Sequence, residues 1–162
     1  MASAPEFEAK ICRPQELAAR LKTLKRPLVF TNGVFDILHR GHVTYLAQAR
    51  ALGASLMVAV NSDASARKLE KGEDRPVNAL EDRVALVAAL ESVALVTWFE
   101  EETPLELIRS VRPDVLVKGG DWKVDAIVGA KEVKSWGGSV HSIPFAHERS
   151  TTALLARIRG KS

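Results

Sequence analysis

The chain has 162 residues, enough for one domain with a buried core and too few for two domains of ordinary size. Hydrophobic residues make up 46% and charged residues 27%, the composition of an ordinary globular protein. The net charge is only +3, and 20 acidic residues are interspersed with 23 basic ones, so no basic block of the kind that binds nucleic acid is present.

Signals for export or membrane insertion are also missing from the sequence. No apolar run approaches the length of a membrane span, and the N-terminus has no signal-peptide core. The single cysteine, Cys12, excludes an intramolecular disulfide and fits a reducing compartment. We therefore expect a cytoplasmic protein that binds neither membranes nor nucleic acids.

The N-terminal segment predicts one helix. Residues 1–12 show no periodic pattern, and we expect no regular structure there. Three leucines in the next segment stand at i, i+4 and i+7: Leu17, Leu21 and Leu24. This spacing predicts an amphipathic helix over 13–26 that ends before Pro27 and covers the domain.

A strand, a glycine-containing loop and a helix follow. Leu28-Val-Phe30 has the composition of a buried strand, and residues 43–52 repeat their apolar side chains at helical spacing. The twelve residues 31–42 between them read Thr-Asn-Gly-Val-Phe-Asp-Ile-Leu-His-Arg-Gly-His. A turn between a buried strand and a helix start is where backbone N–H groups bind phosphate.

Three residues of this loop are candidates for chemistry. Gly33 has no Cβ, so we expect a ligand to approach the main chain closely there. His39 and His42 are three residues apart and would share one face of a helix that begins near them. Both imidazoles would then face the same anion.

The rest of the chain alternates strands and helices. Four more segments predict strands, of which the last is more polar than the others: 54–60, 93–97, 114–118 and 139–143. Four more segments predict helices, with Pro104 at the first position of one and Ser150 or Thr151 as the N-cap of another: 80–90, 104–109, 130–136 and 150–158. Five strands alternating with helices predict an α/β fold: a Rossmann-like, doubly wound, five-stranded parallel sheet with helices on both faces.

Polar residues stand at the ends of three of the later elements. After the second strand, a charged, loop-like segment over 64–78 carries the cations Lys68, Lys71 and Arg75. After the fourth strand, two glycines stand between a cation and a carboxylate in Lys118-Gly-Gly-Asp121. At the start of the last helix, Arg149-Ser-Thr-Thr152 offers a cation and three hydroxyls. Because ligands bind at the carboxyl ends of parallel strands, these segments predict a site for a phosphorylated ligand.

Several other classes of binding site are not indicated, because the sequence lacks their motifs. The sequence has no Gly-x4-Gly-Lys-Ser/Thr, which argues against a P-loop kinase or ATPase. It has no Gly-x-Gly-x-x-Gly, so the dinucleotide-binding fingerprint is also missing. No spacing of cysteine and histidine indicates a zinc site, and we predict no metal ligands among the side chains.

The order of Gly-x-Phe-Asp and His-x-Gly-His at a strand–helix junction resembles the nucleotidyltransferase superfamily that includes the cytidylyltransferases and pantetheine-phosphate adenylyltransferase. The resemblance covers residues 28–158. Further motifs appear in order: Val60-Asn-Ser-Asp-Ala-Ser, Arg75-Pro-Val-Asn, Leu116-Val-Lys-Gly-Gly-Asp, Lys131-Glu-Val and Ser150-Thr-Thr. Together they are similar to the heptose 1-phosphate adenylyltransferases of ADP-heptose synthesis, in their separate form rather than as half of a bifunctional kinase–adenylyltransferase.

The resemblance implies a reaction. ATP and D-glycero-β-D-manno-heptose 1-phosphate would give ADP-heptose and pyrophosphate, with Mg²⁺, as a step toward lipopolysaccharide or surface heptose. It also implies a homodimer, with a nucleotidyltransferase domain over 27–162 and an N-terminal extension and covering helix over 1–26.

Roles for individual residues follow from the same resemblance. His42 would act at the α-phosphate and His39 toward the leaving β-phosphate, while Lys68 or Lys71 would bind the sugar phosphate or the α-phosphate. The predicted ATP-binding residues are Asn32, Gly33, Val34, Phe35, Gly41, Lys118, Gly119, Gly120, Asp121, Arg149, Ser150, Thr151 and Thr152. The predicted sugar-binding residues are Asp36, Asn61, Asp63 and Arg75.

Two alternatives stay open at this stage. One is a cytidylyl- or adenylyltransferase for another sugar or polyol phosphate, because nothing in the motif selects adenine over cytosine. The other is a non-catalytic nucleotide-sensing module on the same fold, since a fold does not determine a function. The presence of both histidines argues against the sensor, which would need neither.

Overall fold

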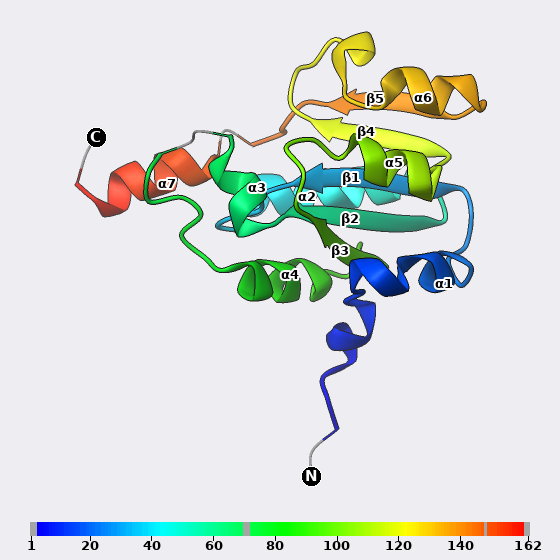
Figure 1. The fold of residues 1–162 in the computed structure, drawn as a ribbon. Helices are drawn as coiled ribbons and strands as arrows, with labels where there is room; N and C mark the ends of the chain where they lie inside the picture. The colour runs from blue at the N-terminus through cyan, green and yellow to red at the C-terminus, as the bar shows by residue number, and fades with distance from the viewer. Residues whose placement is uncertain (1–2, 70–71, 148, 161–162) are drawn as a thin grey trace.

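The computed structural model describes residues 3–69, 72–147 and 149–160. Its centre is a five-stranded sheet in the order β3-β2-β1-β4-β5, and every neighbouring pair of strands is parallel (Figure 1). The strands are β1 Leu28–Gly33, β2 Ser55–Asn61, β3 Leu95–Phe99, β4 Val115–Gly119 and β5 Ser139–Ile143. The first strand, β1, lies at the centre of the sheet, and the later strands are added first on one side of it and then on the other. This arrangement confirms the predicted doubly wound fold.

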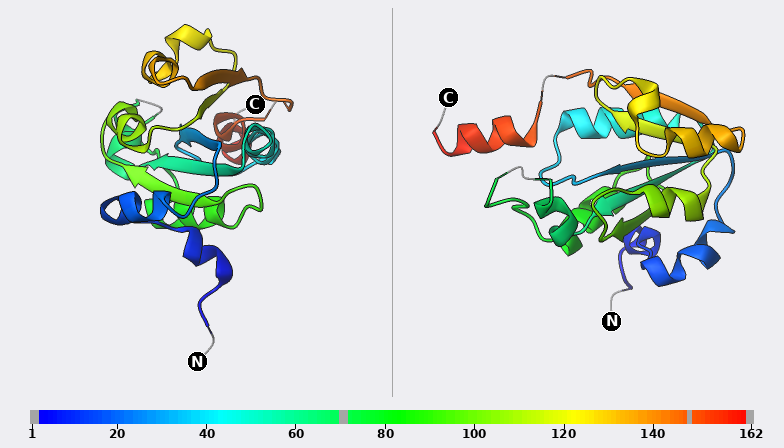
Figure 2. Two further views of the ribbon diagram at one scale, coloured as in Figure 1. Left: turned by 90° about the vertical axis from the view of Figure 1, so that its right-hand side faces the viewer. Right: turned by 45° about the horizontal axis from the view of Figure 1, so that its top comes forward.

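Helices lie on both faces of the sheet, as predicted (Figure 2). The α-helices are α1 Leu17–Leu21, α2 Arg40–Arg50, α3 Asp63–Arg67, α4 Leu80–Ala88, α5 Leu105–Val111, α6 Ala130–Ser135 and α7 Thr151–Ile158. Short 3-10 helices are η1 Glu6–Lys10, η2 Pro14–Glu16 and η3 Val124–Ala126. Among the described residues, no helix is long and apolar enough to cross a membrane.

Side chains that alternate between the two faces of the sheet form two hydrophobic cores, one on each face. Phe30 of β1 and Met57 of β2 belong to the cluster that packs against α1, α5 and α6. Val29 and Leu56, one residue earlier, belong to the cluster that packs against α2 and α4. Successive side chains of a strand point to opposite faces, so the nearly continuous apolar runs of the sequence fill both layers at once.

The first residues of the chain differ from the prediction. Residues 6–10 form η1 where no regular structure was expected. Two residues further on, the Cys12 backbone N–H donates to Val96 O of the edge strand β3, at 2.8 Å. The segment is therefore ordered by its contact with the sheet edge, which no periodic pattern in its own sequence could indicate.

The first predicted helix is also shorter than expected. The α-helix α1 covers only Leu17–Leu21, so the predicted range of 13–26 is wrong in length. The 3-10 helix η2 precedes it, and the Thr23 hydroxyl donates to the Arg20 carbonyl at 2.7 Å just beyond it. That hydrogen bond satisfies a carbonyl at the helix end without a further helical turn.

Other boundaries shift by a few residues. The first strand runs to Gly33 rather than ending at Phe30, because the residues between them continue to pair with β2. The third strand lies at 95–99, two residues later than predicted. A short helix, α3, opens the segment expected to be a loop, and Pro104 is the residue before α5 rather than its first.

Candidate active site

A crevice opens where the sheet order reverses. β1 pairs with β4 at Val29 and Phe30, whereas it pairs with β2 along its whole length to Gly33. Beyond Phe30 the carboxyl ends of β1 and β4 therefore separate. This is the topological switch point, the place where open α/β sheets bind their ligands.

Tyr45 of α2 spans the floor of this crevice. Its hydroxyl hydrogen-bonds the Thr31 hydroxyl of β1 and donates to Val117 O of β4, at 3.4 Å. Burial raises the pKa of Tyr45 well above its usual value, so the hydroxyl keeps the proton that it donates. Tyr45 thus holds β1 and β4 together at the point where their own ladder has ended.

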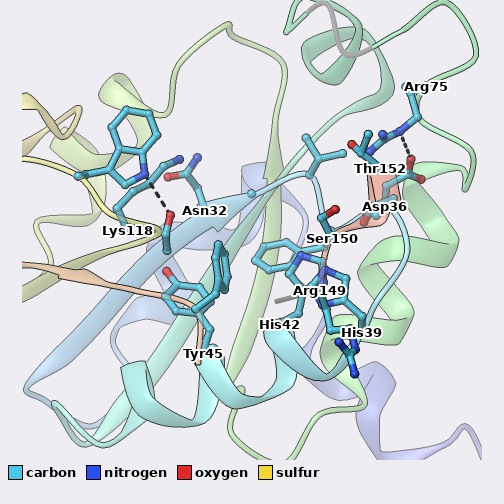
Figure 3. A pocket seen from close by; sticks show the side chains of 17 residues that line it. Asn32, Asp36, His39, His42, Tyr45, Arg75, Lys118, Arg149, Ser150 and Thr152 are labelled. Atoms are coloured by element: carbon cyan, nitrogen blue, oxygen red, sulfur yellow. Dashed lines mark hydrogen bonds and ion pairs between the residues drawn. The ribbon is translucent and has the colours of Figure 1, made fainter. Parts of the chain in front are cut away.

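Above this floor lies a cavity of about 490 Å³ (Figure 3). Each of the predicted phosphate-binding segments contributes to its wall. The lining residues are Asn32, Gly33, Val34, Phe35, Asp36, His39, His42, Tyr45, Arg75, Lys118, Gly119, Trp122, Phe145, Arg149, Ser150, Thr151 and Thr152. The structure therefore brings together segments that are far apart in the sequence.

The two histidines lie at the start of α2. Their rings stack with centroids 3.9 Å apart, and His39 is the N-cap, its Nδ1 accepting a hydrogen bond from the Gly41 N–H at 3.1 Å. Burial and the positive charge of Arg149 lower the pKa of His39 from its ordinary value of 6.5. A Cβ on Gly41 would lie 2.9 Å from the His39 ring, so only glycine leaves room for this arrangement. Gly41 itself is not among the described lining residues, and it supports the histidine rather than the wall.

Phe35 explains the glycine that precedes it in the motif. Its backbone lies in the left-handed region, with φ of 50°, which costs a non-glycine residue about 1–3 kcal/mol. The turn places the Phe35 ring against Gly33, where a Cβ would come within 2.9 Å of the ring, and edge-on to His42 with centroids 5.3 Å apart. The absence of a Cβ at Gly33 therefore makes room for the Phe35 ring. Gly33 also lines the cavity, and the close approach of a ligand to its main chain stays a prediction.

The end of β4 forms the opposite wall. Gly120 has φ of 114°, and the Trp122 indole N–H donates to the Gly119 carbonyl at 3.1 Å. Lys118 lies with its ammonium 5.8 Å from the centre of the Trp122 ring. Lys118 and Gly119 line the cavity, whereas Gly120 and Asp121 are not among its lining residues.

The N-terminus of the last helix, α7, forms part of the cavity wall. The Ser150 hydroxyl caps α7 by accepting from the Ala153 N–H at 3.0 Å. The Thr151 hydroxyl donates to Ile37 O at 3.1 Å and so ties α7 to the loop after β1. Exposed Arg149 stands before the cap. A cation and a helix N-terminus at one place suit phosphate oxygens.

The carboxylate of Asp36 is hydrogen-bonded by other residues of the protein. It is 2% exposed, and its carboxylate accepts hydrogen bonds from Arg75 Nε at 2.7 Å and from the Val77 and Asn78 N–H groups at 2.9–3.0 Å. Burial acts to raise the pKa of Asp36, but these donors outweigh it and the pKa is lowered. The predicted direct contact of Asp36 with a sugar is not supported by this geometry, because its oxygens hold the segment 75–78 in place.

Arg83 of α4 is a buried cation beneath the site. It is 0% exposed and donates to backbone carbonyls of three separate segments: Val34 O, Asn61 O and Asn78 O. Its remaining partner is Asp63, at 2.7 Å. The predicted sugar ligand Asp63 thus pairs with Arg83 and is not a lining residue of this cavity.

A second cavity of about 230 Å³ adjoins the first. The two share the end of β1 and one part of the opposite wall: Asn32, Gly33, Val34, Lys118 and Trp122. The rest of the second cavity is lined by Asn61, Leu69, Glu102, Thr103, Pro104, Ala126, Ile127 and Val128. It mixes apolar surface with a few polar groups, as binding sites for small molecules do.

The two predicted lysines are not both placed. Lys68 is exposed, and its ammonium donates to the Glu100 carbonyl at 3.4 Å. Lys68 is not among the described lining residues of either cavity, although its neighbour Leu69 lines the smaller one. Lys71 lies outside the described residues. The choice between them for a phosphate contact therefore stays a prediction.

Comparison with known families identifies the fold family. The family model described as cytidylyltransferase-like matches residues 30–157, most of the chain and the whole of both cavities. The chain belongs to the cytidylyltransferase-like family.

Named relatives of this cytidylyltransferase-like protein are close in sequence. It is 60% identical, over 97% of its length and 98% of the relative, to D-beta-D-heptose 1-phosphate adenylyltransferase of Bordetella bronchiseptica. It is 55% identical, over 85% of its length, to the bifunctional protein HldE of Pseudomonas syringae, of which it spans only 29%. Among solved structures, the lipopolysaccharide core biosynthesis protein of Thermoplasma volcanium matches with a TM-score of 0.62 and 30% identity, over 75% of this chain and 98% of that one.

The larger cavity does not fit a protein-bound Mg²⁺. Mg²⁺ prefers carboxylate and phosphate oxygens, and Asp36 is the one carboxylate among the described lining residues. Its oxygens are already engaged by Arg75, Val77 and Asn78. Within the described ranges, no three metal-binding side chains gather anywhere.

Several residues of the larger cavity and of its support were not predicted from the sequence. Tyr45 stands three residues after His42 on the same helix, a spacing that could have indicated a shared face. Trp122 directly follows the glycine segment, whereas Phe145 gives no sequence signal. Arg83 sits between apolar residues of a helical stripe, where a charged residue must find buried partners.

Proposed function

We infer that this protein transfers the adenylyl group of ATP to D-glycero-β-D-manno-heptose 1-phosphate, forming ADP-heptose and pyrophosphate. The observation that carries the inference is the 60% identity with a heptose 1-phosphate adenylyltransferase, over nearly the full length of both chains. The cavity supports it, since the histidines, the glycine segment and the capped helix all line one space. ADP-heptose would then supply heptose for lipopolysaccharide core or another surface glycan.

The chemistry requires no covalent enzyme intermediate. An oxygen of the sugar phosphate attacks the α-phosphorus of ATP, the bond from that phosphorus to the bridging oxygen breaks, and pyrophosphate leaves with the electron pair. Negative charge grows on the phosphoryl oxygens, so positioning and charge stabilisation supply the catalysis. Cations, imidazoles and helix N-termini are suited to that task.

His42 and His39 act at the reacting phosphates in this proposal. His42 hydrogen-bonds an α-phosphate oxygen, and His39 lies toward the β-phosphate. The stacked rings keep both imidazoles on one side of the nucleotide, and Phe35 supports His42 from its edge. Backbone N–H groups of Val34 and Phe35 bind phosphate oxygens beside them.

The nucleotide spans the larger cavity. Arg149 and the N-terminus of α7 hold the β- and γ-phosphates, because they place positive charge at one end of the cavity. Lys118 and Gly119 border the base at the other end, where Trp122 adds aromatic surface. The adjoining smaller cavity takes the sugar, with Asn61 and Glu102 as polar groups on its wall.

Three further assignments are part of the proposal. Mg²⁺, if required, would be held by the nucleotide rather than by side chains and would offset phosphate charge, because the one described carboxylate on the wall of the larger cavity is already engaged. The protein acts in the cytoplasm, where ATP is available. It forms a homodimer, on the resemblance alone, and light scattering coupled to size-exclusion chromatography tests that assignment.

The deciding experiment measures pyrophosphate release with each nucleoside triphosphate against a panel of sugar 1-phosphates. We expect ATP with the manno-heptose 1-phosphate to react far faster than any other pair. Mannose 1-phosphate, which lacks the seventh carbon, is the matched control. Equal or faster turnover with CTP and a polyol phosphate would indicate the cytidylyltransferase alternative, and binding without any turnover would indicate a sensor.

A further inference from the structure

Arg75 stands on the wall of the larger cavity in a fixed position. Its side chain is 10% exposed, and its Nε donates to the Asp36 carboxylate at 2.7 Å. Asp36 belongs to the same loop after β1 that leads to His39 and His42. The residue that anchors Arg75 and the two histidines therefore share one short segment of the chain.

The neighbours of Arg75 belong to the phosphate end of the cavity. Arg75, Asp36 and Thr152 all line the larger cavity, and in the view of Figure 3 they lie toward one side of it, with Lys118 of β4 toward the other. Asp74, the preceding residue, pairs with Arg159 just after α7, so a second contact joins this segment to that helix. Arg75 does not line the smaller cavity, where the sugar is proposed to bind.

The chemistry of the pair leaves Arg75 able to bind an anion. Asp36 also accepts from two backbone N–H groups, so its charge is stabilised by more than the guanidinium. Arg75 meets it through Nε, and among the described residues neither Nη group has a hydrogen-bond partner. A guanidinium with both Nη groups available beside a cavity presents the planar fork that binds phosphate oxygens.

We propose that Arg75 binds the leaving pyrophosphate portion of ATP, opposite Arg149, and does not contact the acceptor sugar. This assignment replaces the sequence-based prediction, which placed Arg75 among the sugar-binding residues. It rests on the proposed function for the identity of the leaving group. Arg75 forms and breaks no covalent bond; it stabilises charge on oxygens that become pyrophosphate.

Calorimetric titrations of inorganic pyrophosphate, AMP and the sugar 1-phosphate into the full chain test this assignment. We expect Arg75→Ala to weaken pyrophosphate binding by about 10- to 100-fold, the effect of losing a charge-assisted hydrogen bond. Binding of AMP and of the sugar 1-phosphate should change by less than about twofold, since neither carries the leaving phosphates. Arg67→Ala, which removes an exposed cation from α3, is the control for net charge.

A second variant covers a failure to fold. Arg75→Lys keeps a positive charge beside Asp36 but lacks the fork, so it should fold and still bind pyrophosphate more weakly than the wild type. Unchanged pyrophosphate affinity in both variants, or a selective loss of sugar 1-phosphate binding, would overturn the proposal. If the wild-type protein itself bound neither ATP nor pyrophosphate, the proposed function would fail instead, and the two failures are thereby distinguished.

Discussion

The loops that follow β1 and β2 use their polar residues in different ways. After β1, His39 and His42 stack on each other and line the cavity within a twelve-residue motif. After β2, the charged residues find partners far away in the sequence: Arg75 pairs with Asp36, 39 residues distant, and Lys68 reaches a carbonyl 32 residues distant. In a motif at a strand–helix junction, the local backbone determines how the side chains lie. In a charged loop, the partners of the side chains depend on the rest of the fold.

The largest effect should come from removing the residue that holds both loops. Arg83→Met leaves three backbone carbonyls and Asp63 without their buried donor. We expect a loss of about 3–5 kcal/mol in the free energy of unfolding, measured by urea denaturation. The control, Arg109→Met on α5, removes only half-exposed ion pairs and should leave the urea midpoint nearly unchanged. A loss below about 1 kcal/mol in Arg83→Met would mean that the two loops are held independently.

Replacing His42 should damage the chemistry alone. An interaction that strengthens in the transition state appears mainly in kcat. We expect His42→Ala to lose on the order of 10²–10³ in kcat, to bind ATP within severalfold of the wild type, and to keep its melting temperature. Single-turnover rates and melting curves on one sample separate this outcome from a packing role. A stable variant with wild-type turnover would end the catalytic assignment.

His39 should make stability depend on pH. Its pKa in the folded protein is lower than the 6.5 of an ordinary histidine, so the unfolded chain takes up the proton first as the pH falls. The free energy of unfolding should therefore decrease as the pH drops below 6.5, until the folded-state pKa is passed. His39→Asn keeps an N-cap side chain without the titration and should show a smaller decrease. The same pH dependence of stability in the wild type and in His39→Asn would contradict a lowered pKa of His39.

The smallest effect should distinguish the two lysines of the second loop. Lys68→Ala removes an exposed ammonium that contacts Glu100 O, so we expect KM for the sugar phosphate to stay unchanged. Lys71→Ala should raise that KM if the sequence prediction of a phosphate-binding lysine applies to Lys71. Steady-state kinetics at saturating ATP measure both variants. A raised KM in Lys68→Ala would assign the contact to Lys68.

The elements and the first loop could be predicted from local patterns. Strand composition and turn residues predicted all five strands, and Ser150 was one of the two residues predicted as the N-cap of the last helix. The histidine pair followed from a spacing of three residues at a helix start. Such signals lie within a few residues of one another, where backbone geometry alone determines which side chains meet.

Only the tertiary structure decided the partners of the buried polar groups. Gly33 is required by the ring of Phe35, Asp36 holds the segment 75–78, and Tyr45 joins two strands that have separated. Each of these assignments depends on which strand, loop or ring the fold places beside the residue. The sequence by itself determined a parallel α/β sheet with a phosphate-binding loop, because periodicity and spacing are local. Which charges face the ligand was decided by the folded chain, since a buried polar group must pair with whatever donor or acceptor packing places next to it.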